Sequence, residues 1–263
     1  HKQFMTGVDF SPQPAPLPVD PYFMGVWYGD GTKARRSDNG TLAHVQVTKP
    51  DPEIEALMRE TAASWDLQVH WHTNASGCPH WSITGGQAGK GKSNPLLEAL
   101  RAITGDGTQL PHAYLTAARN ERAQFLAGFL DTDGHLQGNC FEIIQKRRGF
   151  ADGICFLARS LGLRATMSTK YVTGYATPYW RINISGELTI LPMRIPRKQP
   201  APRRQIKNVC RTGITVEAIG DGPYAGFELD GDGRFLLGDF TVTHNSSLLQ
   251  MIQMALHGKL LPV

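Results

Sequence analysis

YFMGVWYGDG at residues 22–31 and FLAGFLDTDG at residues 125–134 share one layout within the 263-residue chain. In each stretch an apolar run containing small residues leads to an aspartate, Asp30 or Asp133, and then to a glycine. Such a run predicts a helix, and the final glycine favours a left-handed C-terminal cap. One Asp-Gly after a helix is ordinarily a capping turn, but two matching copies indicate a duplicated unit.

The elements that follow each stretch also correspond. After each we expect a strand pair, and then an amphipathic helix, PEIEALMRETAASWDL at 52–67 or ADGICFLARSLGL at 151–163. The similar strands HWSITGG at 80–86 and YWRINISGE at 179–187 come next. The order of helix, strands, helix and strands therefore occurs twice, which predicts an α+β fold with pseudo-twofold symmetry.

The two small-residue helices are expected to lie on the pseudo-twofold axis. Gly25 and Gly29 in one helix, and Ala127 and Gly128 in the other, would let the two backbones approach unusually closely. The helix ends then lie side by side and bring the two aspartates together. Neighbouring carboxylates repel unless a cation separates them, and hard divalent cations prefer oxygen ligands. The pattern therefore predicts metal-assisted phosphodiester hydrolysis.

The stretches FMGVWYGDG and LAGFLDTDG resemble the paired signatures of the LAGLIDADG homing endonucleases, the first in a form similar to that of inteins such as the vacuolar ATPase intein. The resemblance covers residues 19–205, with halves at about 19–112 and 113–205. It implies a monomeric pseudo-dimer of two αββαββα halves that grips double-stranded DNA with its antiparallel sheets. It also implies that Asp30 and Asp133 bind Mg²⁺ and that both DNA strands are cut.

Basic residues lie in or beside the strands after each signature and in a later basic strap. This strap, RIPRKQPAPRRQIKNVCR at 194–211, carries seven basic residues and no acidic one, and its prolines exclude a regular helix. It is either a solvated interdomain linker or a phosphate-contacting segment. The DNA-contact residues predicted in all are Arg35, Arg36, Lys146, Arg147, Arg148, Arg194, Arg197, Arg203 and Arg204.

One departure from the family pattern concerns lysine. Active members usually carry a lysine near each cleavage centre, one of them just ahead of an Ile-Pro before the second signature. The matching stretch GTQLPHAYL at 107–115 has none, whereas Lys198 is a candidate catalytic residue for the second half. One centre is therefore either weakened or supplied with charge from elsewhere. A catalytically degenerate DNA-binding module and an RNA maturase of the same fold are the alternatives.

The chain continues past the expected endonuclease with three β-rich stretches separated by Gly and Asp turns. The last, GRFLLGDFTVTHN at 233–245, is followed by Ser246. An asparagine side-chain amide can attack its own backbone carbonyl and break the next peptide bond when a neighbouring group assists. Asn245 would be this nucleophile and His244 the assisting group, while the Ser246 hydroxyl could have captured an acyl group beforehand.

The stretch FLLGDFTVTHNS resembles the C-terminal splicing block of inteins. The resemblance implies that residues 206–245 are the C-terminal piece of a β-rich Hint splicing domain, and that 246–263 are a C-extein (host) stub. Residues 1–18 are then a Pro-rich linker or a remnant of the splicing domain. Complete splicing is expected only with an N-terminal intein fragment bound in trans, because no N-terminal splicing block is recognised.

Composition and charge exclude a membrane protein. The formal net charge is +4, no apolar run is long enough to cross a bilayer, and no signal peptide opens the sequence. Four scattered cysteines without a C-x-x-C pair predict free thiols in a reduced compartment. We therefore expect an intracellular protein, located in the cytoplasm or with the nucleoid or nucleus.

Overall fold

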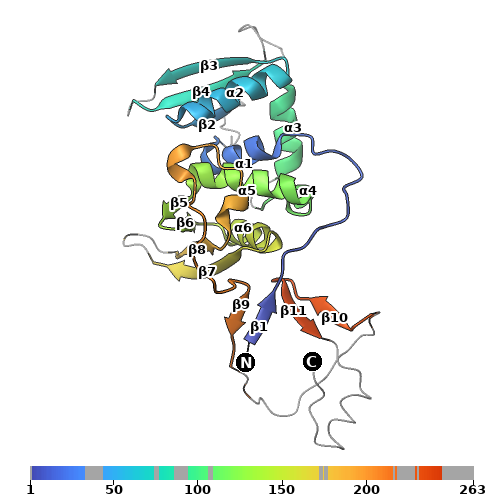
Figure 1. Ribbon diagram of the computed structural model, residues 1–263. Coiled ribbons are helices and arrows are strands. Elements are labelled where there is room, and N and C mark those ends of the chain that lie inside the picture. The colour runs from blue at the N-terminus through green and yellow to red at the C-terminus, as the bar shows by residue number, and fades with distance from the viewer. Residues whose placement is uncertain are drawn as a thin grey trace, which may run out of the picture.

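A computed structural model of the chain describes residues 2–32, 44–73, 77–85, 94–105, 109–171, 174, 177–215, 217, 229 and 231–244. Within these residues the strands form three sheets. Two central helices lie between the sheet built from residues 44–84 and the sheet built from residues 135–185, which contain more strand residues than the third sheet (Figure 1). All four cysteines are free thiols. Among the helices of these ranges, none has the length and apolarity that a membrane crossing requires.

The central pair consists of α1 (Pro21–Asp30) and α5 (Arg119–Asp133). The Asp20 carboxylate caps α1 by accepting a hydrogen bond of 2.8 Å from the Phe23 amide. Both helices carry long runs of buried residues on every side, which is typical of helices at the centre of a core. The prediction that these two helices pack against each other is confirmed, and they lie at the centre of the core.

Glycines let the two backbones touch. A Cβ built at Gly25 would lie 2.1 Å from the Phe125 carbonyl oxygen, and one at Gly128 would lie 2.1 Å from that of Tyr22. No side chain fits at either position, so the predicted close approach is confirmed. The prediction of left-handed caps is wrong, because Gly31 and Gly134 have negative φ values of −78° and −75°.

Both capping positions still require glycine, for a steric reason. A Cβ at Gly31 would lie 2.3 Å from the Trp27 carbonyl oxygen, and one at Gly134 would lie 2.6 Å from that of Leu130. The chain leaves each helix directly in an extended conformation, which is why no left-handed residue is needed there.

Each half of the molecule builds an antiparallel sheet on the central helices. The first sheet has the strand order β2-β4-β3, and the second has the order β5-β6-β8-β7. The elements of the first half after α1 are β2 (His44–Thr48), α2 (Pro52–Ser64), β3 (Gln68–Thr73), β4 (Pro79–Thr84) and α3 (Pro95–Thr104). Those of the second half around α5 are α4 (His112–Leu115), β5 (His135–Gln137), β6 (Cys140–Gln145), α6 (Arg148–Ser160), β7 (Arg164–Lys170) and β8 (Tyr179–Ser185).

The second half departs from the expected αββαββα order at its end. After β8 the chain forms two 3-10 turns, Leu188–Ile190 and Pro196–Lys198, in place of a final α-helix. Pro192 and Pro196 explain the difference, since proline removes a backbone donor and breaks a helix interior.

A small third sheet lies beyond the second half, away from α1 and α5 (Figure 1). Its strands run in the order β10-β11-β1-β9, with the bounds β1 (Lys2–Met5), β9 (Arg211–Gly213), β10 (Arg234–Leu236) and β11 (Thr241–His244). The opening residues of the chain are therefore a strand, and they pair with β11 through Phe4 and Val242. Residues 246–263, predicted to be a host stub, lie outside the described residues.

Aromatic rings join the small sheet to the second half. The ring of Phe156 on α6 lies 6.0 Å from that of Phe10 and 4.8 Å from that of Phe240, measured between centroids. The Val8 amide donates a hydrogen bond of 2.9 Å to the Ser160 carbonyl nearby. The segment before α1 and the turn before β11 therefore dock on the same helix.

Candidate active site

Asp30 and Asp133 are the last residues of the two central helices. A Cβ built at Gly29 would lie 3.5 Å from the Asp133 amide nitrogen and within the side chain of Thr132, so the two helix ends are in contact. The Asp30 side chain is 25% exposed, and Asp133 is an exposed residue. The two carboxylates are thus held at touching helix ends and remain open to solvent.

Lys49 lies between the two helix ends. Its Nζ is 2.7 Å from the Asp30 Oδ2 and donates a hydrogen bond of 2.9 Å to the Thr132 carbonyl. Its side chain is only 15% exposed, although it belongs to the turn between β2 and α2. No sequence pattern marks Lys49. Its ammonium group supplies positive charge to the helix ends, although the stretch ahead of Leu110-Pro111 has no lysine.

Lys198, the predicted catalytic lysine, reaches the same helix end from the second 3-10 turn. Its Nζ donates hydrogen bonds of 3.1 Å to the Leu130 carbonyl and 2.9 Å to the Thr132 carbonyl. Burial, followed by the nearby charges of Lys49 and Arg197, lowers the pKa of Lys198 to about 8. A lysine with this pKa can exchange a proton near neutral pH.

A buried carboxylate positions the strap that carries Lys198. The Asp131 Oδ2 accepts hydrogen bonds of 2.5 Å from the Tyr22 hydroxyl, 2.8 Å from the Arg194 amide and 3.4 Å from the Ile195 amide. Asp131 is fully buried, and burial raises its pKa. It therefore ties α1, α5 and the basic strap together behind the two lysines.

Two of the predicted DNA-contact arginines hold the strap to the first half. Arg197 forms a two-pronged ion pair with Asp51, at 3.0 and 2.7 Å, and Arg194 pairs with Glu60 at 3.1 Å. Both acidic partners belong to α2 or its N-cap. This end of the strap is consequently an intramolecular clamp, and phosphate contact by these two arginines stays a prediction.

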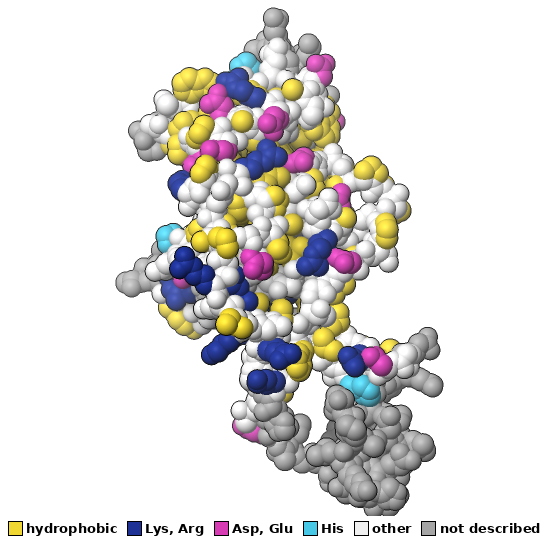
Figure 2. All heavy atoms as spheres, viewed as in Figure 1, with side chains coloured by type: hydrophobic (Ala, Val, Ile, Leu, Met, Phe, Trp, Pro, Cys, Tyr) yellow, Lys and Arg dark blue, Asp and Glu magenta, His cyan; other side chains and the backbone are white. Residues whose placement is uncertain are grey.

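The remaining predicted contacts lie mainly on the second half. Lys146, Arg147 and Arg148 are exposed at the turn into α6, where the Arg148 guanidinium lies 4.4 Å from the centroid of the Trp180 ring. Arg204 is exposed, and Arg203 donates a hydrogen bond to the Lys207 carbonyl. Arg35 and Arg36 lie outside the described residues. Figure 2 shows that most Lys and Arg side chains on the visible face lie over the second half and the segment leading to β9.

The donor set at the helix ends fits a hard divalent cation. Mg²⁺ is usually held by one or two carboxylates together with waters and substrate phosphates. Asp30 and Asp133 supply such carboxylates on an open surface. In the part of the chain that the structure covers, no cluster of three or more His, Cys, Asp or Glu residues suits a metal, and metal binding by Asp30 and Asp133 stays a prediction.

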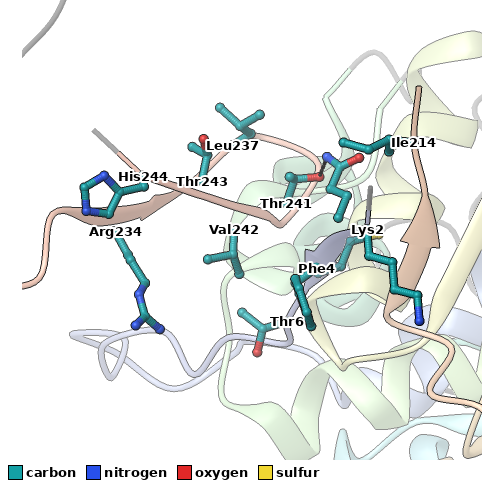
Figure 3. A pocket seen from close by; sticks show the side chains of 12 residues that line it. Lys2, Phe4, Thr6, Ile214, Arg234, Leu237, Thr241, Val242, Thr243 and His244 are labelled. Atoms are coloured by element: carbon teal, nitrogen blue, oxygen red, sulfur yellow. Dashed lines mark hydrogen bonds between the residues drawn. The ribbon is translucent and has the colours of Figure 1, made fainter. Parts of the chain in front are cut away.

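The predicted splicing residues lie in the small sheet. His244 ends β11, is exposed and pairs across the sheet with Arg234 on β10. Both line a cavity of about 820 Å³, and Figure 3 shows them with Phe4 and Val242, which also line it. Asn245 and Ser246, predicted as nucleophile and acyl acceptor, lie outside the described residues.

Comparison with known proteins connects the second half to a family. Residues 109–187 match the family model described as homing endonuclease. The chain is 26% identical over 172 residues to the homothallic switching endonuclease of Saccharomyces cerevisiae, a match that covers 57% of this chain and 28% of that protein. These matches support a homing endonuclease domain.

A second curated relative is a DNA helicase. The replicative DNA helicase DnaB of Mycobacterium intracellulare is 32% identical over 158 residues, which cover 59% of this chain and 21% of the helicase. The chain therefore spans less than a third of the length of either curated relative.

The solved structures that match this chain include homing endonucleases. The structure of I-DmoI in complex with DNA and Ca has a TM-score of 0.45 at 15% identity, and the match covers 63% of this chain and 82% of that chain. I-WcaI bound to its DNA recognition sequence has a TM-score of 0.42 at 15% identity, over 68% of this chain and 83% of that one.

Proposed function

We propose that this chain is an intein-borne LAGLIDADG homing endonuclease that cleaves both strands of a specific DNA site. The observation that carries the proposal is the convergence of Asp30, Lys49 and Lys198 on the end of α5, next to Asp133. The partly buried Asp30 carboxylate, the exposed Asp133 carboxylate and two largely buried ammonium groups form a charged centre that the core of a purely structural domain does not need.

The residues of this centre have distinct roles in the proposal. Asp30 and Asp133 would hold Mg²⁺, which when bound would polarise the scissile phosphate and activate water. Lys49 fixes the Asp30 carboxylate and balances its charge. Lys198 accepts a proton from the attacking water, because its pKa lies near 8.

DNA binding in this proposal uses the polar faces of the two large sheets together with exposed basic residues. The second sheet carries Arg164, Lys170 and Arg181 on its polar face, and Lys146 and Arg148 lie beside it. Contacts of this kind with phosphate release counterions, so affinity should fall steeply with salt.

The C-terminal part of the chain is proposed to carry out the late steps of splicing. His244 would assist cyclisation of Asn245, and the cavity beside β1 and β11 would take an N-terminal splicing segment in trans. The helicase match supports this context. The helicase match and the match to the switching endonuclease must overlap on this chain, because they cover 59% and 57% of it. An endonuclease-like segment that makes up a small part of a helicase is the arrangement expected of an insertion into a host protein.

A cleavage assay tests the nuclease. A duplex selected by the protein from a randomised pool without metal is incubated with Mg²⁺, and the products are separated on a denaturing gel. Asp30→Asn and Asp133→Asn should each lower cleavage by at least about 100-fold while binding persists. Asp232→Asn, at an exposed aspartate of the small sheet, is the control and should cut normally. Binding by the wild-type protein without Mg²⁺-dependent cutting would indicate the degenerate DNA-binding module instead.

A further inference from the structure

The first sheet has one apolar and one polar face. Val45, Val47, Trp81 and Ile83 are buried on the side of the helices. Side chains alternate along a strand, so their neighbours occupy the opposite face. This opposite face, here called the histidine face, consists of His44, Gln46, Thr48, Gln68, His70, His72, His80, Ser82 and Thr84.

Two of the four histidines of this face are in direct contact. His72 and His80 are directly opposite on paired strands, with ring centroids 4.9 Å apart. The Thr48 hydroxyl lies 2.5 Å from the His80 Nδ1, and Gln46 contacts the His44 ring. His70 and His72 are exposed, so their rings can meet a ligand without rearrangement of the sheet.

In the strands that the structure describes, this face carries no charged side chain besides its histidines. The described strands β2, β3 and β4 contain no Lys, Arg, Asp or Glu. Helix α2 packs on the opposite face, where Arg59 lies 6.0 Å from the centroid of the Trp81 ring. Lys49 follows β2 but is engaged by Asp30. The second sheet differs, because its polar face carries Arg164, Lys170 and Arg181, with Glu142 near Arg181.

We propose that the histidine face is a proton-dependent DNA contact, which reads base edges when neutral and binds phosphates when protonated. The inference rests on the proposed function, by which both polar faces meet the duplex. The second sheet then supplies charge at every pH, whereas the described strands of the first supply charge only when their imidazoles are protonated.

The sign of the effect follows from linkage. Burial and then the charge of His72 lower the pKa of both His44 and His80 in the free protein, so these rings are neutral at pH 7. A DNA phosphate favours the protonated form, and binding therefore takes up protons. Affinity must rise as the pH falls, and the dependence of binding on salt must become steeper.

The experiment measures binding of a labelled random-sequence duplex to the full chain in EDTA, over a range of salt, at about pH 6 and about pH 8. Each imidazolium that contacts a phosphate should steepen the fall of log affinity with log salt by about 0.9 at the lower pH. His70→Gln with His72→Gln should remove up to about two such increments at about pH 6 and change little at about pH 8.

Two controls separate this effect from others. Lys170→Gln on the second sheet should make the fall of log affinity with log salt less steep, by the same amount at both pH values. His112→Gln, at an exposed position on α4, should change neither slope.

Equal slopes at both pH values for a protein that binds DNA and cuts it with Mg²⁺ would overturn the histidine inference and leave the proposed function intact. An equal loss of the pH effect in His112→Gln would also overturn it. Absence of DNA binding at both pH values would overturn the inference and the proposed function together.

Discussion

Gly128→Ala should force the two central helices apart. The new Cβ would lie 2.1 Å from the Tyr22 carbonyl oxygen and 3.0 Å from the Val26 amide nitrogen. These are backbone atoms of a buried helix and cannot rotate away, so α1 and α5 must separate by about 1 Å to restore an ordinary contact. Overpacking of this kind lowers the free energy of unfolding by about 1–3 kcal/mol. Because both helices are rigid, we expect a loss near the upper end of this range. A loss of about 3 kcal/mol lowers the Tm by roughly 6–12 °C in a chain of this size.

The same separation should impair cleavage more than stability alone explains. Lys49 spans the two helices through contacts of 2.7 Å with Asp30 and 2.9 Å with Thr132, and a shift of about 1 Å leaves at least one of them broken. Displacements of this size cost about 100-fold in rate when they move catalytic groups.

The assay combines thermal unfolding, followed by circular dichroism, with single-turnover cleavage well below the Tm. Gly213→Ala is the matched control, because a Cβ at that position has no atom within 4 Å. If the Gly128 variant melts and cuts like the Gly213 variant, the helices are not in backbone contact, and the proposed assembly of the centre is wrong.

Three further predictions concern single side chains. Lys198→Met keeps the buried stem but removes the ammonium group, so cleavage should fall by at least about 100-fold and lose its rise with pH near 8. Burial raises the pKa of Asp131 in the folded protein, so the folded state favours its protonated form. The resulting stability is fully present below the unfolded-state pKa of about 3.9 and is lost as the pH rises through the pKa of Asp131 in the folded state. Asp131→Asn should therefore flatten the pH dependence of the urea midpoint, and an unchanged dependence would contradict this origin. Asn245→Ala should abolish cleavage between residues 245 and 246, and mass spectrometry that finds the same C-terminal fragment from the variant would refute the splicing role.

The central helices could be predicted because the relevant signals are local. Glycines at positions 25 and 128 leave no side chain between two backbones, and the repeated Asp-Gly marks where each helix ends. The conformation of Gly31 could not be predicted in the same way. Glycine fits a left-handed cap and a crowded extended residue equally well, and only the position of the Trp27 carbonyl decides between them.

Lys49 and the strap arginines show what sequence patterns omit. Lys49 precedes a Pro-Asp-Pro turn like many surface lysines, and its role arises only because that turn reaches the end of a helix from the other half. Arg194 and Arg197 look like free phosphate ligands in the sequence, since the strap contains no acid. Their partners, Glu60 and Asp51, are distant in the chain and become neighbours only when the strap folds back over α2.

The duplicated signatures have diverged into complementary parts of one centre. Gly29 and Thr132 occupy matching positions in the two copies, and the missing side chain of the first makes room for the side chain of the second. The Thr132 carbonyl then receives both Lys49 and Lys198, so the two ammonium groups gather on one helix end rather than one on each. Asp131, which secures the strap behind Lys198, has Tyr28 as its counterpart in the first copy, and that hydroxyl reaches the Gln109 carbonyl instead. The two copies therefore place their helices against each other but do not share their chemistry, and in the proposed endonuclease damage to the end of α5 should affect the cutting of both DNA strands.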